Sequence, residues 1–171
     1  MHPYSGQLLE QAWHLWSLDR TRPRQVNLRQ AISCAYYALF HAIVQEGAAL
    51  LAPANPAGLR ANLARRFGHR PMREVCRQIA RGAAIPGVPN VRLVVTTPSA
   101  ELRRIADAFH PLQELRHTAD YDLHATFDRL RAELSITLAE NAIKDWYRIL
   151  STNKDEAAAF AVSLLFGGKE H

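Results

Sequence analysis

The chain has 171 residues, 48% of them hydrophobic, and a formal net charge of +5, which suits a single domain with a sizeable core and favours anionic partners. Its two cysteines, Cys34 and Cys76, lie far apart without CxxC spacing, which excludes a disulfide scaffold. No segment approaches the roughly 20 apolar residues of a membrane span, and no secretion signal is visible, so we expect one cytoplasmic domain over residues 1–171.

Apolar residues at three- and four-residue spacing predict helices along most of the chain. In chain order, the first two predicted helices cover residues 5–18, with Ser5 as N-cap, and residues 25–51. Two short helical pieces within residues 59–81 follow, with breaks at Gly68 and Pro71, and then a helix that starts at Ser99 and kinks at Pro111. The last two helices run from Asp122 or Thr126 to about residue 150, and over residues 155–166 before a left-handed cap at Gly167 and Gly168. We therefore predict an all-α fold, an antiparallel bundle of four to five core helices plus short accessory helices, with its core over about residues 8–150.

Two helices carry more specific expectations. The helix over residues 25–51 is apolar over a wide face and should lie centrally, with Tyr36 in the core and Tyr37 at a groove or dimer contact, because adjacent helical residues point about 100° apart. The helix that ends near residue 150 should bury one stripe of side chains: Phe127, Leu130, Leu134, Leu138, Ala142, Trp146 and Ile149.

Basic charge is concentrated between Arg60 and Arg81, where Glu74 is the only carboxylate among seven arginines. Arg73, Arg77 and Arg81 share one helical face. Such a stripe can contact RNA phosphates in a salt-dependent way, or it can simply be a solvated basic face.

The segment ELRHTADYDL, residues 114–123, gathers several reactive side chains. The guanidinium of Arg116 offers a planar fork that suits phosphate or carboxylate, and Asp120 stands four residues later, where it can orient that fork on a helix. The alternative is an ordinary Arg–Asp pair packed on Tyr121.

Two segments together resemble a known family. RQAISCAYYALFHAI (residues 29–43) and RHTADYD (residues 116–122) are similar to motifs of the HEPN superfamily (higher eukaryotes and prokaryotes nucleotide-binding), in its small stand-alone bacterial branch. The matching positions are Ser33, Ala35, Tyr36, Tyr37, Ala38, Phe40 and His41 in the first segment, and Arg116, Ala119, Asp120 and Tyr121 in the second.

The resemblance implies a helical bundle, homodimers, and association with RNA, a nucleotide or a partner nucleotidyltransferase in toxin–antitoxin pairs. Many HEPN proteins are metal-independent ribonucleases whose signature is an Arg followed four to six residues later by a His. Here Tyr121 stands inside that window after Arg116 and no His does. A phenol with a pKa near 10 is a poor general base compared with imidazole, so we expect a binding protein and no enzyme.

Three functions follow as hypotheses. The first is RNA or nucleotide binding through a cleft formed by Arg116, Asp120, Tyr121, Tyr37 and His41, with Arg73 and Arg77 contributing phosphate contacts. The second is a ribonuclease in which His41 or His69 serves Arg116, against the alternative that His41 is a buried, hydrogen-bonded histidine. The third is a non-catalytic dimeric interaction module. We expect no metal and no cofactor, because sets such as His117, Asp120 and His124 lack a tight ligand spacing.

Overall fold

The computed structural model describes residues 2–18, 21–54, 57–88, 91–93 and 95–167. This part contains seven helices and, apart from one isolated bridge between Val88 and Val91, no β-structure. The helices are α1 (Pro3–Ser17), α2 (Gln25–Leu51), α3 (Ala57–Ala64), α4 (His69–Ala80), α5 (Ala100–Tyr121), α6 (Arg129–Thr152) and α7 (Lys154–Phe166). The predicted all-α fold is confirmed. No described helix combines the length and apolar composition that a membrane span requires.

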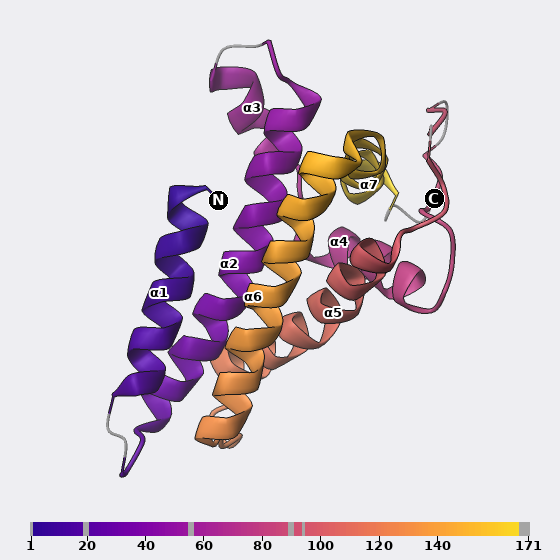
Figure 1. Cartoon of the computed structure of the whole chain (residues 1–171). Helices are drawn as coiled ribbons and strands as arrows, with labels where there is room; N and C mark the ends of the chain where they lie inside the picture. Colours follow the sequence, from indigo (N-terminus) through magenta and orange to yellow (C-terminus); the bar gives the residue numbers. More distant parts are fainter. Residues whose placement is uncertain (1, 19–20, 55–56, 89–90, 94, 168–171) are drawn as a thin grey trace.

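Helix α2 is the central element of the bundle. It packs against α1, α3, α5, α6 and α7, and α1, α2 and α6 run side by side as three long helices (Figure 1). Its alanines at three- and four-residue spacing, Ala31, Ala35, Ala38 and Ala42, are fully buried, because small side chains let neighbouring backbones approach closely. Tyr36 is fully buried and Tyr37 is half-buried, as the sequence predicts.

Of the three predicted N-caps, one is confirmed. Ser99 caps α5, and its Oγ accepts a hydrogen bond from the amide of Leu102 at 3.1 Å. Helix α6 begins later than predicted, because Asp128 is its cap and accepts from the amide of Arg131 at 2.7 Å. Ser5 is not a cap: α1 already begins at Pro3, and the Ser5 Oγ donates to the Ala38 carbonyl at 2.7 Å.

One predicted break and the predicted end cap also differ. The interruption between α3 and α4 lies at Gly68, whereas Pro71 stands in the first turn of α4, where a helix needs no amide donor. Helix α5 continues through Pro111 to Tyr121. Helix α7 ends at Phe166, and its C-cap Gly167 has a right-handed φ of −78°, so no left-handed cap forms there; Gly168 lies outside the described residues.

The buried face of α6 differs from the predicted stripe in its first half. Leu130, Leu134 and Leu138 are 62%, 54% and 37% exposed. In this half of α6 the core is instead contacted by a neighbouring row of mostly smaller side chains: Ala132, Ser135, Ile136 and Ala139. Helix α6 contacts α1, α2, α5 and α7, and close packing against neighbours favours the row with small residues.

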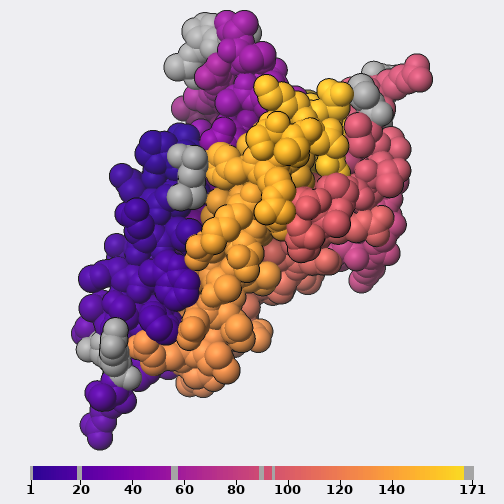
Figure 2. Space-filling view, in the orientation of Figure 1, coloured from indigo at the N-terminus to yellow at the C-terminus, as the bar shows by residue number. Residues whose placement is uncertain are grey.

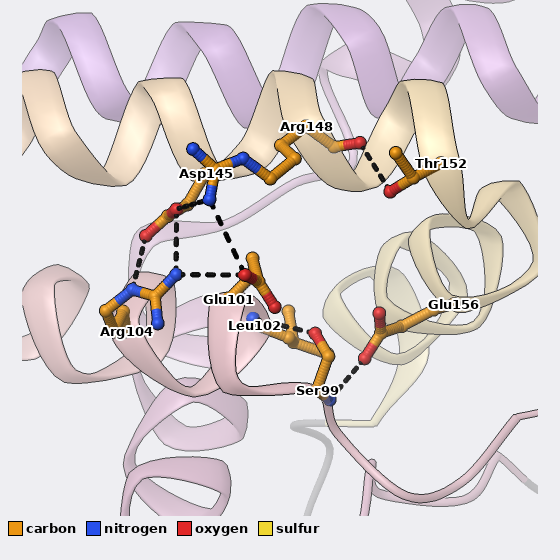
Figure 3. A network of polar contacts seen from close by, with 8 residues as sticks. All are labelled: Ser99, Glu101, Leu102, Arg104, Asp145, Arg148, Thr152 and Glu156. Atoms are coloured by element: carbon orange, nitrogen blue, oxygen red, sulfur yellow. Dashed lines mark hydrogen bonds and ion pairs between the residues drawn. The ribbon is translucent and has the colours of Figure 1, made fainter.

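A network of polar contacts joins α5, α6 and α7 (Figure 3). Arg104 makes two hydrogen bonds to the buried carboxylate of Asp145, at 2.7 and 3.0 Å, and pairs with Glu101 at 3.2 Å. The buried carboxylate of Glu156 accepts from the backbone amide of Ser99 at 2.5 Å. Each buried acid therefore has a hydrogen-bond donor, and the start of α5 is fixed to α7.

Candidate functional site

Tyr37, on the central helix α2, is the middle of the site. Arg116, on α5, donates a hydrogen bond from Nη2 to the Tyr37 hydroxyl at 2.5 Å, and its guanidinium carbon lies 5.0 Å from the centre of the Tyr37 ring. The same carbon lies 5.6 Å from the centre of the Tyr36 ring. At these distances a cation is attracted to an aromatic face, so the two tyrosines hold Arg116 between the helices.

Arg116 and Asp120 form the predicted pair one helical turn apart. Arg116 Nε and Asp120 Oδ2 are 3.2 Å apart, and their side chains are 13% and 22% exposed. Arg116 Nε makes no hydrogen bond within the described part of the chain, so its attraction to Asp120 is mainly coulombic. Burial lowers the pKa of Arg116, but the contacts with Tyr37 and Asp120 outweigh burial and raise it; the guanidinium stays charged.

Asp120 is also held from α2. The Ser33 hydroxyl donates to Asp120 Oδ1 at 2.5 Å, across 87 residues of sequence. Cys34, next to Ser33, has a raised pKa, mainly because of burial and also because of the Asp120 carboxylate, so its thiol stays protonated and unreactive at neutral pH. Asp120 therefore keeps one fixed orientation, with lone pairs left for a further donor.

Two histidines lie next to Tyr37. The centre of the His69 ring lies 6.1 Å from that of Tyr37, and Nδ1 of His69 is hydrogen-bonded to the Tyr36 hydroxyl at 2.6 Å. His41 stacks on Tyr37 with ring centres 6.3 Å apart. Burial lowers the pKa of both histidines; Arg116 and His41 lower that of His69 further, and His2 that of His41. Both imidazoles are therefore neutral at pH 7.

A cavity of about 760 Å³ opens beside this cluster, between α2, the end of α5 and the segment that follows it. Ser33, Tyr37 and Asp120 contribute polar atoms to it, and the 66% exposed ring of Tyr121 lies at its edge. Arg29 also lines the cavity, and it donates hydrogen bonds to the carbonyls of Ala119, in the last turn of α5, and of Asp122 and Ala125, in the segment that follows.

The predicted residues do not all share this cavity. Arg116 lies behind its wall, and His41 lines a second hollow of about 520 Å³ between α2 and α3. The expectation of one cleft lined by Tyr37, His41, Arg116 and Asp120 is therefore wrong in that respect, although these side chains are contiguous through Tyr37. Arg116 is instead directed onto Tyr37, to which it donates a hydrogen bond, and its side chain is only 13% exposed.

Arg73 and Arg77 are engaged with carboxylates. Arg73 pairs with Glu114, on α5, and Arg77 makes two hydrogen bonds to Glu74, at 2.9 and 2.6 Å. Their side chains are partly exposed, so an RNA phosphate would compete with Glu114 and Glu74 for them.

Sequence reasoning did not single out Ser33 and Arg29 as site residues. Ser33 could have been found, because it stands in the first of the two resembling motifs. Arg29 gives no local signal, since its three carbonyl partners lie 90 to 96 residues away.

Fold and site together define an all-helical protein with a polar cavity that has aromatic rings at its edge and is supported by a partly buried cluster of Arg116, Tyr37 and Asp120. Within the described residues, no three His, Cys, Asp or Glu side chains converge to hold a metal ion. Comparisons of the chain with protein-family models, with curated proteins and with solved structures find no match.

Proposed function

We propose that the protein is a HEPN-like domain that binds single-stranded RNA or a nucleotide in the cavity beside Asp120, without cleaving it. The observation that carries the proposal is the contact between the two motifs of the resemblance: Ser33 and Tyr37 from the first bond to Asp120 and Arg116 from the second. A cytoplasmic protein with a nucleotidyltransferase partner is the setting that the resemblance implies.

The cavity has the parts that an unstacked base requires. Tyr121 offers an exposed ring for stacking, which is how proteins hold single-stranded bases without reading a duplex. The Asp120 carboxylate can accept from the amino group of a base, in the manner that carboxylates accept from the N4 amino group of cytosine. Arg116 has a positioning role in this proposal, because its guanidinium orients Tyr37 and Asp120 from behind and adds positive potential at the wall.

Binding of fluorescein-labelled RNA, followed by anisotropy between about 50 and 200 mM salt, tests the proposal. Single-stranded oligonucleotides should bind more tightly than a duplex, and Tyr121→Ala should weaken binding about tenfold, in line with the roughly 1–3 kcal/mol that stacking of one base contributes. Phe166→Ala, which removes an exposed ring on α7, is the matched control and should bind like the wild type. Absence of binding at low salt, or equal affinity of the two variants, refutes the proposal.

A metal-independent ribonuclease is the second candidate, and one observation favours it. The two histidines with lowered pKa, His41 and His69, both contact Tyr37, and His69 feels the charge of Arg116. A neutral imidazole can take a proton from a ribose 2′-hydroxyl. RNA cleavage in the presence of a chelator, lost in His69→Ala or His41→Ala and retained in the exposed control His14→Ala, would establish this function instead.

A further inference from the structure

The hollow between α2 and α3 carries positive charge that no carboxylate balances. Arg60 and Arg65 line it, and none of its described lining residues is an aspartate or a glutamate. The arginines of α4 differ in this respect, since Arg73 and Arg77 are paired with carboxylates. Figure 2 shows α3 and the adjoining end of α2 as a purple lobe that projects beyond α1. A concave surface lined by one sign of charge attracts ligands of the opposite sign, so this hollow favours an anion.

The two arginines stand at the edges of one face of α3. Successive helical residues are about 100° apart, so Ala61 and Ala64 lie between the two arginines on the surface of the helix. The helical path continues to the second arginine, because the amide of Arg65 donates to the Ala61 carbonyl at 3.1 Å. The small alanines leave space between the two long side chains, so both guanidinium groups can contact one ligand.

The two guanidinium groups differ in how firmly they are held. Arg60 donates from Nε to the Ala52 carbonyl at 2.9 Å and from Nη2 to the Pro53 carbonyl at 2.6 Å, at the end of α2. A guanidinium has further N–H donors besides these, which stay available to a ligand. Arg65 donates a long hydrogen bond of 3.4 Å to Asn62 Oδ1 and has no carboxylate partner within the described part of the chain. One cation is therefore fixed in place, and the other can close onto an incoming anion.

The opposite wall of the hollow is apolar. It is formed by Phe40 and Val44 of α2, which are buried, and the half-buried Gln45 adds one side-chain amide beside them. The hollow has a volume of about 520 Å³. Sites for small molecules typically measure about 300–1,000 Å³ and combine apolar walls with a few polar groups that fix the orientation of the ligand. This hollow has both properties.

We propose that the hollow binds a small organic anion, with its carboxylate or phosphate head on Arg60 and Arg65 and its apolar body against Phe40 and Val44. The planar fork of arginine pairs with either head group through two parallel hydrogen bonds. The apolar wall should make an anion that carries a ring bind more tightly than the bare ion, because the ring loses contact with water. The inference does not depend on the proposed RNA site, since the two cavities share no described lining residue.

The first test is a titration of the ¹⁵N-labelled full chain, followed by amide chemical shifts at constant ionic strength. The probes are benzoate, phenyl phosphate and inorganic phosphate. At least one aromatic probe should saturate with a dissociation constant of about 1 mM or lower, and should shift the amides of residues 40–45 and 60–65. The aromatic probe that binds more tightly identifies the head group. Inorganic phosphate should bind at least about fivefold more weakly than phenyl phosphate. If neither aromatic probe saturates, or if inorganic phosphate binds as tightly as phenyl phosphate, the proposal is overturned.

The second test separates a built site from general charge attraction. Arg65→Ala should weaken binding of the aromatic probe about tenfold, because one charged fork is lost while the helical circular dichroism stays unchanged. Arg66→Ala is the matched control: it removes the same charge at the next, exposed residue, which does not line the hollow, and it should bind like the wild type. Equal weakening by the two substitutions contradicts the proposal. Tyr121→Ala, in the proposed RNA cavity, should leave the probe affinity unchanged, so failure of the RNA proposal and failure of this one give different results.

Discussion

Replacing Arg116 with alanine tests whether the side chains around Tyr37 hold α5 to α2 and so stabilise the wall of the cavity. The change removes the hydrogen bond to Tyr37, the ion pair to Asp120 at 3.2 Å and the contacts with two aromatic faces at 5.0 and 5.6 Å. A hydrogen bond from a charged group contributes about 1.5–3 kcal/mol, and a partly buried cation–π contact adds about 0.5–1 kcal/mol. We expect the free energy of unfolding to fall by about 2–4 kcal/mol, because Asp120 also loses its counter-charge in a half-buried place.

Urea unfolding followed by helical circular dichroism measures this change. The matched control is Arg103→Ala, the same substitution at an exposed position of α5, where the side chain makes one long hydrogen bond of 3.4 Å to the Pro98 carbonyl. We expect the control to change the free energy of unfolding by less than about 0.5 kcal/mol. If Arg116→Ala and Arg103→Ala have the same stability, the guanidinium does not hold α5 to α2, and the reasoning about the site fails with it.

Three further predictions concern stability. Ser99→Ala should lower the free energy of unfolding by about 1 kcal/mol through loss of the α5 cap, and a change near zero in urea unfolding would mean that the cap contributes nothing. Arg29→Met keeps the aliphatic stem but leaves three carbonyls unbonded; amide hydrogen exchange at the end of α5 should become faster, with the start of α5 unaffected as the internal control. Because folding lowers the pKa of His41 and His69 below 6.5, mainly by burial, the unfolded chain binds more protons just below that pH, and stability should fall as the pH drops from about 7.5 to about 5.5. The melting temperature of His69→Gln should depend less on pH, and an equal dependence in variant and wild type would contradict the assignment.

The sequence by itself determined the elements. Periodicity predicted the helices and the central place of α2, and the angular step of a helix placed Tyr36 inside and Tyr37 at its edge. The spacing of Arg116 and Asp120 predicted their pairing, since residues four apart on a helix are neighbours. All of these are local properties, fixed by residues within a few turns of one another.

Only the tertiary structure decided which partners meet across the bundle. On α6, two rows of side chains at helical spacing lead to the buried Trp146: one begins at Leu130 and the other at Ala132. Contact with α1, α2 and α5 determines that the row beginning at Ala132 is the one buried there. The bond from Ser33 to Asp120 and the inward turn of Arg116 onto Tyr37 likewise depend on how α2 and α5 pack. The helical period can be read from a short stretch of sequence. The face that a helix turns to its neighbours also depends on residues far away in sequence, so a local pattern cannot predict it.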